Sequence, residues 1–175
     1  MYKGMIRKTL RAALVLFLLP IMSNAEDLPL TKDYAGNYLC KMTAQAGIHF
    51  DETAGKWISA TFNVEDSAYI VNVIDTGQQS TKQFTGWNAR IYNITVKTFS
   101  GTGTAYPCFN VMAPADERNN ISTANGYAEC FFSQWKYSFD FETLKMQVMF
   151  DGGYMDNELN TDTPAVSVGK CQRID

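Results

Sequence analysis

Hydrophobic and polar side chains alternate along much of the chain, which is the period-two pattern of β-strands. The clearest case is a run in which every second residue is aromatic, namely Trp135, Tyr137, Phe139 and Phe141. After Glu142-Thr143 the alternation resumes and continues through residues 144–150. This pattern predicts an antiparallel hairpin with a turn near residue 142 and one face in a hydrophobic core.

Other segments are rich in β-branched and aromatic residues and predict further strands. They are residues 38–42, 57–64, 68–74, 90–99, 106–111, 127–132 and 165–174, with a bulge expected at Gly169. No segment keeps a helical apolar stripe for three turns. We therefore expect an all-β fold of eight or nine strands, either a single closed antiparallel β-barrel or a β-sandwich, because both arrangements protect strand edges.

The first 25 residues follow a different pattern. A basic segment ends at Arg11, and an apolar run covers residues 12–19. The segment Ser23-Asn24-Ala25 then places small residues at both recognition positions of a cleavage site. This order predicts a secretory signal peptide over residues 1–25 and a single secreted domain over residues 26–175. The apolar run is shorter than the ~20 residues of a membrane-spanning helix, so we expect cleavage rather than anchoring, and no later segment is long enough to span a bilayer.

Removing the predicted leader changes the charge of the chain. The whole sequence of 175 residues has 15 basic and 18 acidic side chains and one histidine, for a net charge of −3. Four basic residues and no acidic ones precede Glu26, which leaves 11 basic against 18 acidic and a net charge of −7. We expect no nucleic-acid partner, because lysines and arginines are not clustered. The single histidine excludes a histidine-rich metal site.

Four cysteines, Cys40, Cys108, Cys130 and Cys171, all lie beyond the predicted leader. An even number in an exported chain predicts two disulfides and a periplasmic or secreted location. Of the three pairings that four cysteines allow, we favour Cys40–Cys171, which joins the ends of the domain, and Cys108–Cys130. The chain has no Cys-x-x-Cys motif, so metal binding or redox chemistry is disfavoured.

One candidate catalytic group is His49, which lies close to Asp51 and Glu52. An imidazole oriented by a carboxylate can act as a general base. A single histidine in a polar segment is more often an ordinary surface residue, and no Gly-x-Ser-x-Gly nucleophile motif occurs. We therefore predict no catalytic residue and expect that the protein is not an enzyme.

A candidate metal site is an acidic loop near the C-terminus. Its oxygen-bearing side chains are Asp151, Asp156, Asn157, Glu158, Asn160 and Asp162. Calcium prefers such oxygen ligands, but the spacing of an EF-hand is absent. A solvated acidic loop is the better interpretation, and we predict no metal and no cofactor.

Residues 26–175 contain 21 aromatic residues. Aromatic side chains that line a β-structure can hold a small apolar molecule, although most such residues simply fill a core. Gly55-Lys56-Trp57 resembles, over three residues, the Gly-x-Trp motif of lipocalins, which implies a calycin-like barrel that carries an apolar ligand. No second lipocalin motif is found in the C-terminal half.

Several short motifs resemble a group of small exported bacterial β-proteins that end in a Gly-x-Cys-x-x-Ile segment. They are Tyr38-Leu-Cys40, Gly47-Ile-His-Phe-Asp-Glu52, Phe139-Asp-Phe-Glu-Thr-Leu144, Gly152-Gly-Tyr154 and Gly169-Lys-Cys171-Gln-Arg-Ile174. The resemblance implies a disulfide-linked β domain whose last strand carries the fourth cysteine. It implies no substrate and no catalytic residue.

Three functions follow as expectations. The first is a non-enzymatic exported protein that binds a small apolar ligand. The second is a protein-binding inhibitor of a cationic target, similar in size and compartment to the lysozyme inhibitors, since a net charge of −7 favours a basic partner. The third is a hydrolase that uses His49 or scattered carboxylates. The identity of the ligand or partner does not follow from the sequence.

Overall fold

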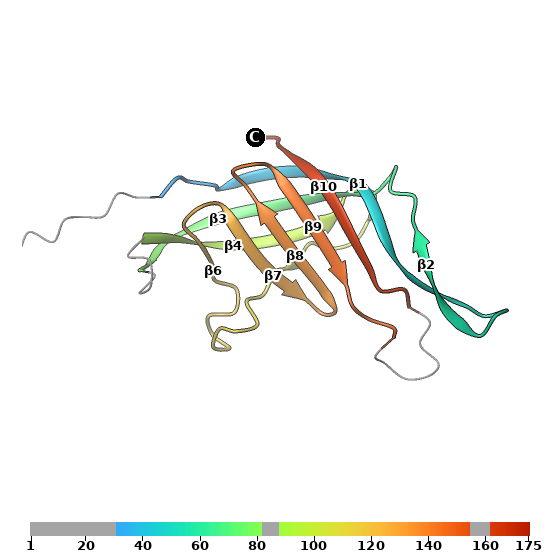
Figure 1. Ribbon diagram of the computed structural model, residues 1–175. Helices are drawn as coiled ribbons and strands as arrows, with labels where there is room; N and C mark the ends of the chain where they lie inside the picture. The colour runs from blue at the N-terminus through green and yellow to red at the C-terminus, as the bar shows by residue number, and fades with distance from the viewer. Residues whose placement is uncertain (1–30, 82–87, 155–161) are drawn as a thin grey trace, which may run out of the picture.

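The computed structural model describes residues 31–81, 88–154 and 162–175, which form ten strands (Figure 1). The predicted signal peptide lies outside the described residues. The strands are β1 (Gly36–Asp51), β2 (Lys56–Thr61), β3 (Ala68–Thr81), β4 (Asn88–Thr98), β5 (Tyr106–Pro107), β6 (Ile121–Thr123), β7 (Tyr127–Phe132), β8 (Trp135–Asp140), β9 (Lys145–Phe150) and β10 (Ala165–Arg173). The predicted all-β class is confirmed.

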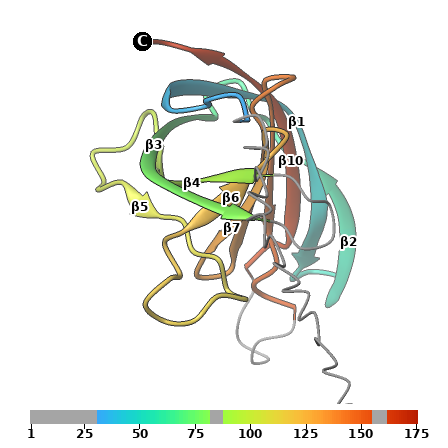
Figure 2. The ribbon, with the colours of Figure 1, turned by 90° about the vertical axis from the view of Figure 1, so that its left-hand side faces the viewer.

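All ten strands belong to one antiparallel sheet. Its order is β5-β4-β3-β1-β10-β9-β8-β7, with β2 on β1 and β6 on β4. The sheet folds over itself, so that β7–β10 lie across β3 and β4 (Figures 1 and 2).

The expectation of a closed barrel or a two-sheet sandwich is wrong, because this single sheet does not close. β5, at one end of the strand order, is only two residues long, and Pro107 has no N–H to offer a further strand. The segment after β5 meets β7 through an isolated bridge between Phe109 and Phe131, through a stacked pair of rings and through a disulfide, and not through a continuous strand pairing.

Both predicted disulfides are confirmed. Cys40–Cys171 joins two residues that are directly paired on β1 and β10, and Cys108–Cys130 joins the segment after β5 to β7. The second bond therefore ties together the two ends of the sheet. Two disulfides indicate an oxidising compartment, either periplasmic or extracellular.

The core is made by the inward positions of the alternating strands, as the pattern predicts. It contains Val71 and Val73 of β3, Tyr92, Ile94 and Val96 of β4, Tyr137 and Phe139 of β8, and Met146 and Val148 of β9. These side chains fill the space between the two halves of the folded sheet, and Phe139 stacks on Phe141 with ring centroids 5.3 Å apart.

The largest difference in element boundaries concerns β1. It runs for 16 residues, well beyond the predicted 38–42, and its far half forms a hairpin with β2 that projects from the body (Figure 1). The expected bulge lies on β1, between Met42 and Ala44, and not at Gly169, which is opposite it. A Cβ atom on Gly169 would collide with the carbonyl oxygen of Lys41, so this glycine allows β1 to approach closely.

Nothing helical occurs among the described residues. The structure accordingly contains, within 31–81, 88–154 and 162–175, no helix with the length and apolar character needed to cross a bilayer.

Candidate functional site

A cavity of about 320 Å³ lies at one end of the folded sheet. We call it the aromatic pocket, because five of its eight lining residues are aromatic. The lining residues are Tyr69, Val96, Thr98, Tyr106, Phe132, Ser133, Trp135 and Tyr137. They come from β3, β4, β5, β7, β8 and the turn between β7 and β8, so the pocket depends on the folding of the whole sheet.

The pocket continues the inward face of the core. Tyr69 precedes the buried Val71 by two residues, and Thr98 follows the buried Val96 at the same spacing. Because successive inward side chains of a strand are two residues apart, these residues extend the inner surface beyond the packed centre. The cavity lies at this end of the inner surface.

One wall of the pocket is held by a disulfide. Tyr106 and Phe132 stack with ring centroids 4.4 Å apart and an interplanar angle of 26°. Each ring lies two residues from a cysteine of the Cys108–Cys130 bond. The Cys108 N–H also donates to the Ile94 carbonyl at 2.8 Å, which fixes this segment against β4.

Two of the lining tyrosines, Tyr69 and Tyr137, lie against each other. The rings of Tyr69 and Tyr137 meet edge to face, with centroids 6.3 Å apart. Burial raises the pKa of Tyr137 to about 12, with a smaller contribution from Tyr69 and Tyr106, and burial also raises the pKa of Tyr69. Neither hydroxyl forms a hydrogen bond with another described residue. Both phenols therefore remain neutral at ordinary pH and are available to hydrogen-bond a ligand.

The chemistry of the lining is that of a binding site. Its polar groups are tyrosine, threonine and serine hydroxyls and the indole N–H of Trp135. No carboxylate, imidazole or basic side chain of the described residues lines it. Such a lining offers neither a general base at neutral pH nor a charge to pair with an ionic ligand. It suits an uncharged molecule with an apolar body and a few polar groups.

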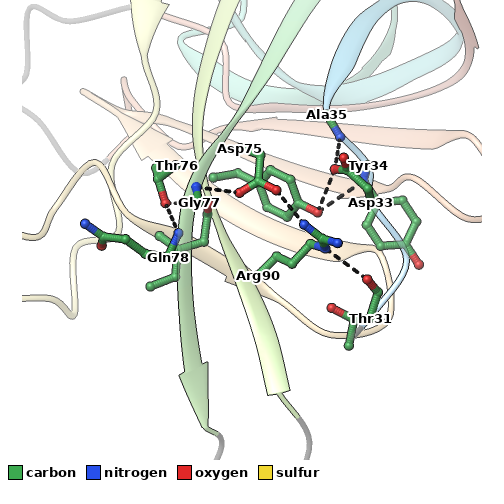
Figure 3. A network of polar contacts seen from close by, with 11 residues as sticks. Thr31, Asp33, Tyr34, Ala35, Asp75, Thr76, Gly77, Gln78 and Arg90 are labelled. Carbon is green, nitrogen blue, oxygen red and sulfur yellow. Dashed lines mark hydrogen bonds and ion pairs between the residues drawn. The ribbon is translucent and has the colours of Figure 1, made fainter. Parts of the chain in front are cut away.

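The opposite end of the folded sheet is closed by a polar network (Figure 3). Arg90 pairs with Asp75 at 2.7 Å, and its Nε donates to the Thr31 carbonyl at 2.9 Å. The Tyr92 hydroxyl accepts from the Tyr34 N–H at 3.1 Å and donates to the Asp33 carboxylate at 3.4 Å. These bonds attach the segment before β1 to the inner surface of β3 and β4.

Tyr34 fills this closed end. Its ring is buried and lies 6.2 Å from that of Phe141. Desolvation by burial raises the pKa of Tyr34, helped by a hydrogen bond to Glu142. The network therefore has a structural role, since it seats an aromatic plug where the other end has a cavity.

The candidate pair of His49 and Asp51 lies on the β1–β2 hairpin. His49 is exposed on β1, opposite Ile58 of β2, and does not line the aromatic pocket. The Asp51 carboxylate accepts hydrogen bonds from the Thr53 and Ala54 N–H groups, at 2.9 and 3.0 Å. Asp51 thus stabilises the turn of the β1–β2 hairpin.

The acidic loop falls partly outside the described residues, which include Asp151 and Asp162 but not Asp156, Asn157, Glu158 or Asn160. No three histidine, cysteine, aspartate or glutamate side chains of the described segments are grouped so that they could hold a metal ion.

The short lipocalin-like motif lies at the turn between β1 and β2. Trp57 packs edge-on against Phe50 and Tyr154, with centroids 5.5 and 5.6 Å away. It contacts neither the core nor the aromatic pocket.

The aromatic residues are recognisable as a class in the sequence, but the set that lines the pocket is not. Its one usable signal is the pair Tyr106 and Phe132, each two residues from a cysteine. Tyr69 and Thr98 have no such marker, because only the pairing of β3 with β4 places them together. No protein-family model matches the chain, and neither a curated protein nor a solved structure was found to be similar to it.

Proposed function

We propose that this chain is an exported binding protein that holds a small uncharged ligand in the aromatic pocket without transforming it. The observation that carries the proposal is the pocket itself. Five aromatic side chains surround a cavity of about 320 Å³, and two of them, Tyr69 and Tyr137, carry hydroxyls with no partner among the described residues. Ligand sites are commonly concave and apolar with a few oriented polar groups.

The absence of charge from this lining favours a neutral ligand over an ionic one. Burying an unpaired charge costs several kcal/mol, whereas an apolar ligand gains about 25 cal/mol for each Å² of its surface that is removed from water. Tyr69 and Tyr137 would then select ligands with a polar group at one end. This extends the expectation of an apolar-molecule carrier to an amphipathic neutral compound.

The test uses N-phenyl-1-naphthylamine, an uncharged aromatic probe whose fluorescence rises in apolar surroundings. We expect saturable binding at one site. Thr98→Trp, which places an indole in the pocket, should abolish the binding. Thr102→Trp is the matched control, because Thr102 is exposed in the loop after β4 and does not line the pocket. Unchanged probe affinity in Thr98→Trp, with the fold intact by circular dichroism, would contradict the proposal.

A further inference from the structure

A second site lies on the outer face of the sheet, where β1, β10 and β9 are neighbours, and it is independent of the aromatic pocket. The pairing register places three rows of side chains across these strands. The rows are Ala46, Val166 and Met149, then Ala44, Val168 and Gln147, then Lys41, Lys170 and Lys145. The outward residues of the three strands thus run from apolar at one end to lysine at the other, with the polar Gln147 between them on β9.

The apolar end of this face is hollowed. A groove of about 390 Å³ is lined almost entirely by apolar atoms, including those of Ala46, Ile48 and Val166. Asp151 is the one charged residue of its lining, so the groove suits the hydrocarbon part of a ligand and not an anionic head group. Val166 is 38% exposed and Val168 is 45% exposed, although β10 is paired with a strand on each side at both positions. An exposed apolar surface of this kind marks a place where a ligand or partner removes it from water.

The basic end is a row of three lysines that face one another across the strands. Lys170 is directly opposite both Lys41 and Lys145, and all three are exposed. Like charges in directly opposite positions destabilise a sheet, so this row is not explained by the stability of the fold. In a domain with a net charge of −7, it gathers three of the 11 basic residues at one level.

Carboxylates of the described residues compensate this row only weakly, through the interaction of Asp140 with Lys145. None of the three lysines forms a salt bridge within the part of the chain that the structure describes. Asp140 is opposite Lys145 on β8, but its carboxylate accepts hydrogen bonds from the Glu142 and Thr143 N–H groups, at 3.1 and 2.9 Å. Hydrogen bonding by Thr143 is the main reason that the pKa of Asp140 is lowered, and the charge of Lys145 makes a smaller contribution.

The two ends are close enough for one molecule to touch both. Val166 and Lys170 are four residues apart on β10, which corresponds to about 13 Å along a strand. We propose that this face binds a single-chain anionic amphiphile, such as a fatty acid. Its hydrocarbon chain lies in the apolar groove and its carboxylate is held by the lysine row.

The test is a titration of the full secreted domain with sodium dodecanoate, below its micelle concentration, followed by amide chemical shifts. We expect saturable shifts confined to β1, β9 and β10. Dodecyltrimethylammonium, which has the same chain and the opposite charge, should not bind at this face. Shifts at Tyr69 and Tyr137 instead, or equal binding of the cation, would overturn the proposal.

Matched lysine variants assign the head group. K41Q/K170Q should weaken dodecanoate binding by about tenfold, because each lysine contributes to holding one negative charge. K56Q/K97Q makes the same change of net charge outside the row and should leave the affinity unchanged. Equal weakening in both variants would overturn the proposal, as would binding to phosphatidylglycerol vesicles with none to monomeric dodecanoate.

Discussion

The two ends of the folded sheet are built from the same strands, yet one is filled and the other is hollow. At the closed end, Tyr34 is inserted between the halves of the sheet and held by hydrogen bonds to Tyr92 and Glu142. At the open end, no described segment fills the equivalent space, which remains as the aromatic pocket. The difference shows that the alternating pattern builds an inner surface, whereas a separate segment decides whether that surface becomes core or pocket.

The ends also differ in what holds them. The closed end relies on Arg90, Asp75 and backbone groups of residues 31–35. The open end relies on a disulfide that anchors the stacked pair Tyr106 and Phe132. Perturbing one kind of connection should therefore leave the other end intact.

The largest effects should come from the disulfides. C40S/C171S should lower the free energy of unfolding by about 5 kcal/mol and C108S/C130S by about 3 kcal/mol, because the longer loop restricts the unfolded chain more. The sequence separations are 131 and 22 residues. We nevertheless expect the second variant to lose more affinity for N-phenyl-1-naphthylamine, since Tyr106 is no longer anchored. Urea unfolding and probe titration measure both, and the reverse order of probe affinities would break the comparison.

A smaller effect is expected at the closed end. Arg90→Met removes the ion pair with Asp75 and leaves the Thr31 carbonyl without its donor, which should cost about 2 kcal/mol in urea unfolding. Lys32→Met is the control at the same end, because Lys32 and Glu142 are 62% and 52% exposed and such pairs contribute less than about 1 kcal/mol. Probe affinity should not change in either variant. A lower affinity for the probe in Arg90→Met would show that the two ends of the sheet are coupled.

The sharpest comparison is between two buried tyrosines. Tyr92→Phe leaves the Tyr34 N–H without its acceptor and should cost about 1–2 kcal/mol. Tyr137→Phe removes a hydroxyl with no hydrogen bond to a described residue, so the unfolding free energy should change by less than about 0.5 kcal/mol. Ligand affinity should behave in the opposite way, falling only in Tyr137→Phe. Equal stability losses in the two variants would mean that Tyr137 has a structural partner.

The last comparison concerns the pH dependence of stability, which has no effect at neutral pH and appears only in alkaline solution. Burial raises the pKa values of Tyr92 and Tyr137 to about 12, while both residues ionise near 10 in the unfolded chain. Between these values the unfolded chain binds fewer protons than the folded one, so stability falls as pH rises from about 10 to 12 and is unaffected below. Urea midpoints across this range should show the loss, and a bound ligand should suppress ionisation of Tyr137 but not of Tyr92. A flat pH profile would contradict the burial of both phenols.

Much of the fold could be predicted because its signals are local. The hairpin of β8 and β9 follows from alternation within residues 135–150, and its buried face is the predicted one. The disulfide pairing was also predicted correctly. The open form of the sheet was not predicted, because closure into a barrel depends on whether distant edge strands pair. The edge strand Tyr106–Pro107 has only two residues and offers too few backbone groups for such pairing.

The candidate sites were predictable only in part. Trp135 and Tyr137 belong to the alternating run, but nothing local relates them to Tyr69 or Thr98. His49 and Asp51 are a candidate pair because they are close in sequence. The Asp51 carboxylate, however, accepts hydrogen bonds from backbone N–H groups of the turn that follows it. Proximity in sequence was therefore a poor guide to chemistry here.

The sequence by itself determined the strand content, the identity of the inward residues and the cysteines available for pairing, because these depend on spacing along one segment. The tertiary structure alone decided that the sheet stays open, that one end is plugged by Tyr34, and that Lys41, Lys145 and Lys170 share one level. The physical reason is register. A strand's own pattern selects which face is buried, but only pairing with distant strands decides which side chains become neighbours.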